Sequence, residues 1–295
     1  MIVEQAQQIR AVDQAEKLRL MARQVRTGAK KTARVLAVTS GKGGVGKTNV
    51  AANLAICLSA AGKDVILFDA DLGLANLDVL LPVKIRFNLA HVIAGKRRLA
   101  EIVQPGPGGI RLVCGASGIT QMADLTEVQR QRLAQEMTQL EYKADVIVID
   151  TGAGISRNVL GFCQSADHTL VVTTTEPTSI TDAYAVIKAL NQGTERLKIS
   201  LLTNMVENRD QAQKVYQRLA FAGERFLNCA IYDAGYVLRD NHLSQAVHQR
   251  KPVVLAFPRC PASYCFVALA QKLIRAGKKE PAGAGFFRKV INWFF

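Results

Sequence analysis

The stretch Gly41-Lys42-Gly43-Gly44-Val45-Gly46-Lys47-Thr48 determines how the rest of the chain is interpreted. An apolar run, 35–40, precedes it, and a helical pattern of small residues, 49–61, follows it. Strand, glycine-rich loop and helix form the context in which the pattern G-x-x-x-x-G-K-[ST] indicates a phosphate-binding loop (P-loop). Glycines let backbone N–H groups surround phosphate oxygens, and the helix directs its positive end at the same anion. The stretch therefore predicts a nucleotide site.

The residue types in this loop suggest how it would hold a nucleotide. Lys47 is placed to reach the β- and γ-phosphates, and the Thr48 hydroxyl to ligate Mg²⁺. The expected nucleotide-binding residues are Gly41, Lys42, Gly43, Gly44, Val45, Gly46, Lys47, Thr48 and Asn49.

Length and composition favour one large α/β domain with appendages in a chain of 295 residues. No apolar run approaches the ~18 residues of a membrane span, and the polar start does not resemble a signal peptide. Six scattered cysteines indicate reduced thiols in the cytoplasm. Cys260 and Cys265 are the closest pair, but their spacing fits no usual metal or redox motif, and we interpret them as structural.

The net charge of +14 is unevenly distributed. Residues 1–34 carry eight Lys/Arg and three Asp/Glu, and residues 272–295 carry six and one, so each end contributes +5. A basic balance usually indicates nucleic acid or an anionic membrane as a partner. Here it directs attention to the two ends of the chain.

Apolar strands alternate with helical patterns from Val35 to about Ala276. The predicted strands are 35–40, 64–70, 110–114, 145–150, 168–174, 197–203 and 226–232. Because they are short and apolar on both faces, they predict a doubly wound, mostly parallel sheet covered by helices on both sides. The ligand is expected at the carboxyl ends of these strands, where the P-loop also lies.

Acidic residues end two of these strands. Alternation along an extended chain puts Asp69 and Asp71 on one side, where both could face Mg²⁺ and the γ-phosphate. Asp150 ends a hydrophobic strand in the Walker B form, so its carboxylate is expected to hold the Mg²⁺ shell. An acidic strand end alone is weak evidence, since Asp often caps a helix. Two acidic strand ends on the strands expected of a P-loop protein are together stronger evidence for a Mg²⁺ site.

The loop with its additional Lys42 resembles the deviant Walker A motif of the MinD/ParA class. The resemblance implies a MinD-like P-loop NTPase of the SIMIBI class, in which this lysine crosses a dimer interface to the partner's phosphates. Residues 69–78 resemble its switch I, and 150–155 its switch II. By this resemblance Lys42 and Asp71 are catalytic, Asp71 orienting or activating water, while Thr48, Asp69 and Asp150 hold Mg²⁺.

Two further stretches resemble the flagellar FlhG/FleN/YlxH branch of this class. Gly152 replaces the proline usual in switch II of MinD, and residues 173–184 match the branch closely.

Asn204 matches the position that reads adenine in the class, and an amide both donates to and accepts from the adenine edge. ATP is therefore favoured, although spacing alone also allows an asparagine in a turn. Residues 237–252 resemble the segment that closes over the base.

The N-terminal region, 1–34, predicts an amphipathic helix over 5–26 followed by a linker. It could pack on its own domain, form a solvated basic arm, or bind a partner. Its D-Q-A-x-x-L-R motif resembles that of FlhG, whose N-terminal helix stimulates the signal-recognition-particle-type GTPase FlhF. The residues expected to contact FlhF are Asp13, Gln14, Ala15 and Leu18, with Gln14 reaching its catalytic site.

The C-terminal region continues from the ATPase domain, 35–276, through a linker, 277–285, into an amphipathic helix, 286–295. One arc of this helix is apolar and contains Phe286, Phe287, Val290, Ile291, Trp293, Phe294 and Phe295. Ten residues cannot span a bilayer but can lie in its interface with basic side chains toward anionic headgroups. The alternative is a tail that packs into a groove of its own domain.

Together these features predict a slow ATPase switch that uses ATP and Mg²⁺, dimerises with ATP and regulates flagellar number and placement. We expect it in the cytoplasm, peripheral on the inner face of the cell membrane when ATP is bound. The resemblance implies FlhF and flagellar switch (C-ring) proteins or a flagellar transcription regulator as partners; nucleic acid is not expected. The alternatives are a division-site MinD ATPase, a DNA-segregation ParA ATPase and a nucleotide-regulated scaffold with negligible turnover.

Overall fold

The computed structural model describes residues 32–71, 77–83, 86–115, 136, 138–192, 197–275, 286 and 289–290. The chain divides into two units, Met1–Thr32 and Ala33–Phe295. Only Thr32 of the first unit is described, so the predicted helix over 5–26 lies outside the described residues. The second unit contains all the elements that follow.

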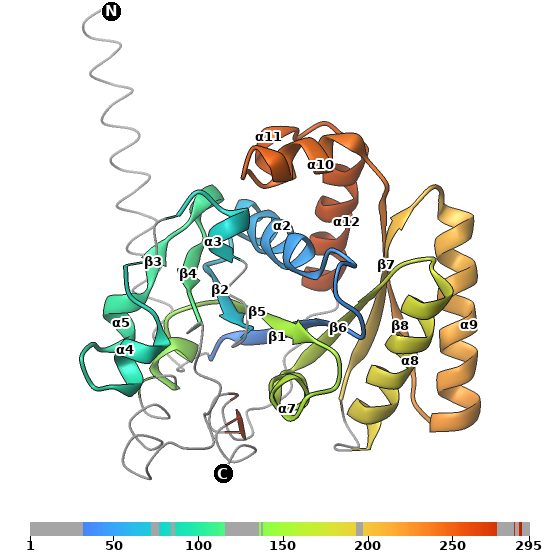
Figure 1. Cartoon of the computed structure of the whole chain (residues 1–295), viewed down its shortest axis with the longest axis horizontal. Helices are drawn as coiled ribbons and strands as arrows, with labels where there is room; N and C mark the ends of the chain where they lie inside the picture. Colours follow the sequence, from blue (N-terminus) through green and yellow to red (C-terminus); the bar gives the residue numbers. More distant parts are fainter. Residues whose placement is uncertain are drawn as a thin grey trace, which may run out of the picture. The chain divides into compact units, whose positions relative to one another are not determined.

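Eight strands of the described residues form one sheet in the order β3-β4-β2-β5-β1-β6-β7-β8 (Figure 1). Their bounds are Arg34–Ser40 (β1), Val65–Ala70 (β2), Gln104–Pro105 (β3), Arg111–Val113 (β4), Val146–Ala153 (β5), His168–Thr173 (β6), Ile199–Val206 (β7) and Ile231–Leu238 (β8). All neighbours are parallel except β3 and β4, which are antiparallel. The predicted doubly wound, mostly parallel sheet is confirmed.

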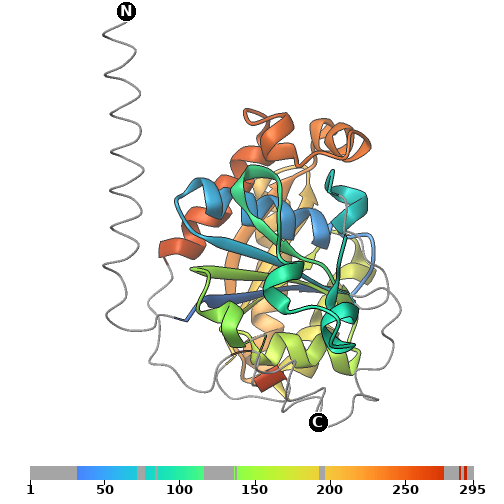
Figure 2. The same ribbon diagram turned by 90° about the vertical axis from the view of Figure 1, so that its left-hand side faces the viewer.

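Helices cover both faces of this sheet, as Figures 1 and 2 show from two sides. One face carries α2 (Lys47–Ala60), α10 (Asn241–His248), α11 (Val253–Ala256) and α12 (Pro261–Arg275); the other carries α4 (Leu89–Ile93), α5 (Leu99–Ile102), α7 (Arg157–Ser165), α8 (Pro177–Asn191) and α9 (Arg209–Leu227). Two short pieces complete the list, α3 (Leu77–Leu80) and the 3₁₀ helix η1 (Pro107–Gly109). No helix in the described ranges is both long and apolar enough to cross a membrane.

Burial on both faces explains why the strands are continuous apolar runs. In β1, Val35 and Ala37 pack into the cluster under α7 to α9, whereas Leu36 and Val38 pack into the cluster under α2 and α12. Successive side chains of a strand point to opposite faces, so a strand covered on both sides needs apolar residues at every position. The same alternation holds for Ile66 and Leu67 in β2.

The order of the strands fixes the place of the site. Strand β1 lies between β5 and β6. After β1 the chain crosses to β2 on the β5 side, and after β5 it crosses over β1 to β6 and continues in the opposite direction along the sheet. This is a topological switch point, where ligands bind outside the carboxyl ends of parallel strands. The P-loop follows β1, so it emerges beside the ends of β5 and β6.

The last strand was placed wrongly from the sequence. The prediction was 226–232, but α9 continues to Leu227, Asn228 ends it in a left-handed conformation at φ 48°, and β8 runs from Ile231 to Leu238. Strand β8 is at the edge of the sheet and has exposed or half-buried polar positions, including Asp233. It therefore lacks the continuous apolar pattern by which the central strands were found.

Candidate functional site

The loop between β1 and α2 curves back on itself through glycines. Gly44 and Gly46 have φ values of 81° and 84°, in the left-handed region that favours glycine. A Cβ on Gly46 would lie 2.5 Å from Asn204 Nδ2, and one on Gly41 would lie 2.3 Å from backbone atoms of Asp182. Side chains at these two positions would collide with β7 and α8. The loop is therefore held close to its neighbours through bare backbone.

The middle of this loop faces open space, and α2 begins without a side-chain cap. A Cβ on Gly43 or Gly44 would have no atom within 4 Å. Gly46 caps α2 with no side-chain hydrogen bond, and the first turn, with Thr48 and Asn49, contains no acidic residue. The first backbone N–H groups of a helix have no partner within the helix. An anion at this helix terminus would satisfy them.

A buried ion pair joins this loop to β5. Lys47 Nζ lies 2.6 Å from Asp150 Oδ1, and the two side chains are 9% and 1% exposed. Burial raises the pKa of Asp150, while Lys47 and the Thr48 hydroxyl oppose that shift by pairing with the carboxylate. The lysine expected to meet phosphate is therefore paired with a carboxylate expected to hold Mg²⁺.

A second buried carboxyl lies directly beside the first. Asp69 on β2 is the register partner of Asp150 on β5, and it is 1% exposed. Its Oδ1 accepts a hydrogen bond from the Asp71 amide at 3.0 Å, and its buried Oδ2 has no partner among the described residues. Burial, reinforced by the charge of Asp150, raises the pKa of Asp69 to about 8. Lys47 thus offsets one of two neighbouring acids.

Asp71 lies against the carboxyl-terminal residues of β5. A Cβ on Gly152 would be 3.6 Å from Asp71 Oδ1, so the predicted switch I and switch II residues come together here. Asp71 is half-buried, and its negative charge also raises the pKa of both Asp69 and Asp150. The three carboxyls therefore share one side of the site. Residues 72–76 of the predicted switch I lie outside the described residues.

The Lys42 ammonium contacts residues at the start of α8. Its Nζ lies 3.1 Å from Glu176 Oε2 and 3.2 Å from Thr178 Oγ1, at the start of α8. The side chains of Lys42 and Glu176 are 43% and 65% exposed, so water screens the pair and it is weak. No role was predicted for Glu176 or Thr178 from the sequence, although both lie in the stretch 173–184 that carries the flagellar resemblance.

Asn204 braces the P-loop from β7. Its Nδ2 donates a hydrogen bond to the Val45 carbonyl at 2.8 Å. Its Oδ1 is buried and has no partner in the described part of the chain. A buried amide oxygen without a donor is costly, because it has lost water and gained nothing. A ligand N–H donor at this point would satisfy it, and the exocyclic amine of adenine is such a donor.

These features fit a magnesium-bound nucleotide. The uncapped start of α2 and Lys47 suit phosphate, and the carboxyls of Asp69 and Asp150 with the Thr48 hydroxyl are the oxygen ligands that Mg²⁺ prefers. Two buried polar atoms, Asp69 Oδ2 and Asn204 Oδ1, have no partner among the described residues and could each be satisfied by such a ligand.

The sequence and fold of this chain are similar to those of known proteins. A family model described as "CobQ/CobB/MinD/ParA nucleotide binding domain" matches residues 36–253. The antiactivator FleN of Pseudomonas aeruginosa is 43% identical over 83% of this chain and 88% of its own length. The flagellum site-determining protein YlxH of Helicobacter pylori is 38% identical over 73% of each chain. The septum site-determining protein MinD of Pyrococcus horikoshii, solved with Mg-ADP, has a TM-score of 0.69 at 23% identity and covers 83% of this chain and 97% of its own.

Fold, loop and matches define a P-loop nucleotide-binding protein of the MinD/ParA class. Its members are ATPases, and this protein is an ATPase that uses ATP and Mg²⁺. The chain belongs to the CobQ/CobB/MinD/ParA family and, within it, to the branch of FleN and YlxH. The resemblance inferred from Lys42, Gly152 and 173–184 is thereby confirmed.

The raised pKa of Asp69 predicts a stability gain on its neutralisation. An unfolded Asp titrates near pH 3.9, so between about pH 4 and 8 the folded protein retains a proton that the unfolded chain releases, and stability falls as pH rises. We expect nucleotide-free Asp69→Asn to unfold at a higher temperature than the parent, by a margin that widens from pH 5 to about pH 8. Thermal unfolding at a series of pH values measures this.

The matched control is Asp233→Asn, which removes an exposed carboxylate paired with Lys272 at 3.4 Å. The difference in unfolding temperature between Asp233→Asn and the parent should not grow over the same pH range. Parallel pH profiles for Asp69→Asn and the parent would contradict the proposed burial of an uncompensated acid.

Proposed function

We propose that this protein is an ATP-dependent dimerising switch that regulates the number or placement of flagella. The observation that carries the proposal is Lys42, a solvent-exposed cation within the P-loop whose ammonium pairs with Glu176 at the surface. The similarity to FleN and YlxH, named an antiactivator and a flagellum site-determining protein, supports the flagellar role. Flagellar switch proteins or a flagellar transcription regulator are the corresponding partners.

The buried residues of the site would bind and position the nucleotide. The N–H groups at the start of α2 and Lys47 hold the phosphates, and Lys47 exchanges Asp150 for them. Thr48, Asp69 and Asp150 hold Mg²⁺, which when bound withdraws charge from the phosphate oxygens. Asp69 must release its proton to do so, because its raised pKa leaves it neutral at pH 7. Asp71, half-buried and next to Gly152, orients the attacking water and accepts its proton.

Lys42 would act only across a dimer. Its partners Glu176 and Thr178 lie on the surface and hold it weakly, so it can leave them at little cost. In a face-to-face dimer its ammonium would reach the phosphates bound by the partner subunit, where it neutralises charge as hydrolysis proceeds. Because this contact exists only when ATP and both subunits are present, ATP favours the dimer by mass action.

The dimer is tested by size-exclusion chromatography with light scattering on Asp71→Ala, which blocks hydrolysis. We expect a dimer with ATP and a monomer with ADP. Adding Lys42→Ala should abolish the ATP dimer while nucleotide affinity stays within a few-fold, because Lys42 does not contact the nucleotide of its own subunit. Lys47→Ala should lose both the ATP-dependent dimer and nucleotide affinity.

The control is Lys214→Ala, an exposed lysine on α9, which should dimerise like its parent. A monomer with ATP in Asp71→Ala, or an unchanged dimer in the Lys42→Ala background, would refute the proposed switch.

The C-terminal helix would alternate between its own domain and the membrane. In this structure Phe286 and Val290 are 5% and 0% exposed and belong to the apolar cluster that includes α4, α5 and α7. Four residues apart, they lie on one face of a helix. This is the docked alternative that the sequence left open; Phe287, Ile291, Trp293, Phe294 and Phe295 lie outside the described residues. We propose that the ATP-bound dimer releases this helix to an anionic membrane on its cytoplasmic face.

Deletion of 286–295 tests this role. The full chain should co-sediment with anionic vesicles when ATP is present and much less with ADP or neutral vesicles, because two helices per dimer raise the effective concentration at the surface. The truncated chain should lose vesicle binding and retain nucleotide affinity, measured with a fluorescent ATP analogue. Undiminished binding of the truncated chain would exclude the helix as the anchor.

The N-terminal helix would supply a residue to a second enzyme. Asp13, Gln14, Ala15 and Leu18, which lie outside the described residues, are proposed to bind FlhF, with Gln14 orienting water in its catalytic site. Full-length protein should accelerate GTP hydrolysis by FlhF, and Gln14→Ala should lose most of that stimulation. Gln7→Ala, a glutamine outside the motif, serves as the control. Equal stimulation by both variants would remove Gln14 from this role.

The rival function is DNA segregation of the ParA type, which the net charge of +14 keeps open. Salt-sensitive binding of the ATP-bound protein to nonspecific DNA would favour it, because phosphate contacts release counterions. The apolar face of the C-terminal helix argues for a membrane instead.

A further inference from the structure

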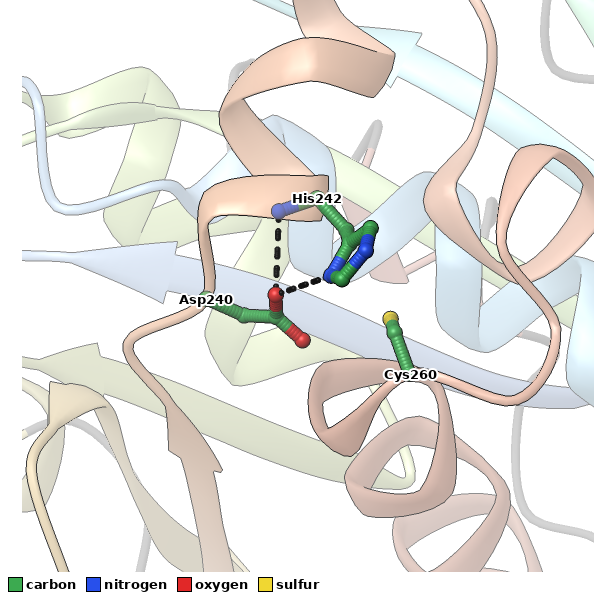
Figure 3. Close-up of side chains that lie close together, drawn as sticks. All are labelled: Asp240, His242 and Cys260. Carbon is green, nitrogen blue, oxygen red and sulfur yellow. Dashed lines mark hydrogen bonds and ion pairs between the residues drawn. The ribbon is translucent and has the colours of Figure 1, made fainter.

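Three different kinds of metal-ligating side chain meet where the segment after β8 contacts the start of α12. They are Asp240, which caps α10, His242 in its first turn, and Cys260, which directly precedes α12 (Figure 3). One ligating atom from each lies within 4.8 Å of the other two. Among the described residues, Cys260 is the cysteine that joins such a group of possible metal ligands.

The carboxylate of this cluster is held in place by the backbone. Asp240 Oδ1 accepts from the His242 amide at 2.9 Å, and Oδ2 accepts from the Ala262 amide at 3.0 Å. Burial by itself would raise the pKa of Asp240, but these bonds and those from the side chains of His242 and Cys260 lower it to about 2. A carboxylate that is ionised at neutral pH and fixed in orientation retains lone pairs for a cation.

The imidazole and the thiol point at this carboxylate from two sides. His242 Nδ1 lies 2.9 Å from Asp240 Oδ1, and its ring also contacts Phe257 with centroids 4.9 Å apart. Cys260 is 6% exposed, and its Sγ lies 3.3 Å from Ser263 Oγ. Because the His242 side chain is 49% exposed, the cluster is open to solvent on one side and closed by protein on the other.

We propose that Asp240, His242 and Cys260 form a binding site for a divalent transition metal of the zinc type. Carboxylate, imidazole and thiolate are all zinc ligands, and three protein ligands leave the fourth tetrahedral position for water. The thiolate excludes Mg²⁺ as the preferred ion, since Mg²⁺ takes oxygen ligands, so this site is distinct from the one at Asp150.

The geometry needs a small adjustment of exposed atoms. Zinc–ligand bonds of about 2.0–2.3 Å place tetrahedral ligands roughly 3.3–3.8 Å apart. The Asp240–His242 hydrogen bond at 2.9 Å must therefore open, and the exposed His242 ring can rotate to allow it. The Cys260 proton leaves as the metal binds, so affinity should rise with pH. The bound ion would tie the start of α10 to the start of α12.

Cobalt(II) titration of the full-length, chelator-treated protein tests the proposal. We expect one equivalent of Co²⁺ to give a thiolate-to-cobalt charge-transfer band and the intense visible bands of four-coordination, both abolished by zinc competition. Cys260→Ser should lose the charge-transfer band. His242→Ala, a change at an exposed residue that should not disturb folding, should weaken Co²⁺ affinity at least tenfold.

The control is Cys229→Ser, a buried thiol elsewhere in the unit, which should bind as the parent does. A second measurement needs no spectrum: zinc should raise the midpoint of thermal unfolding of the parent and of Cys229→Ser but not of His242→Ala. Absence of a charge-transfer band in the parent, its full retention in Cys260→Ser, or equal stabilisation of all variants by zinc would overturn the assignment.

Discussion

The buried contact between Lys47 and Asp150 is the interaction on which the rest of the site depends. It exists because β5 is a neighbour of β1 in the sheet, so the lysine of the loop after β1 reaches Asp150 on β5. One cation faces two buried neighbouring carboxyls, Asp150 and Asp69, and a third, Asp71, close by. Buried charges are stable only when they are paired, and here the acids outnumber the base. The protein groups of the site are therefore short of positive charge, which Mg²⁺ would supply.

The central strands could be predicted because packing on both faces forces a continuous apolar run, as in β1 and β2. The edge strands of the sheet could not be predicted in this way. Strand β8 has one neighbour and is interrupted by polar and half-buried positions such as Asp233. Phe226 and Leu227, predicted from the sequence as strand, end α9 instead. Strand β3 has two residues, Gln104 and Pro105, and only its antiparallel pairing with β4 defines it. Edge strands are defined by tertiary pairing more than by local pattern.

The residues of the site also fall into two groups, those that a local motif predicts and those whose contacts only the fold brings together. The P-loop, Asp69 and Asp150 follow from local motifs, since each motif contains its own strand end. The contact of Lys42 with Glu176 spans 134 residues and that of Asn204 with Val45 spans 159, and no local spacing encodes either. The sequence assigned Asn204 to adenine; in the structure its amide nitrogen braces the loop and its oxygen remains for a ligand. One side chain can therefore couple loop position to base binding.

The proposed switch requires two states of similar free energy, and the C-terminal helix suits that requirement. Burying Phe286 and Val290 contributes about 1.5–3 kcal/mol each. A membrane interface would rebury the same atoms, so release costs only the difference between two apolar environments. Shifting a two-state equilibrium from 1:99 to 99:1 takes about 5.5 kcal/mol. Lys42, held at the surface by a screened ion pair, adds little resistance to the change. In the proposed switch, neither the transfer of the helix nor the loss of the Lys42 ion pair costs much, so the binding of ATP would decide the state.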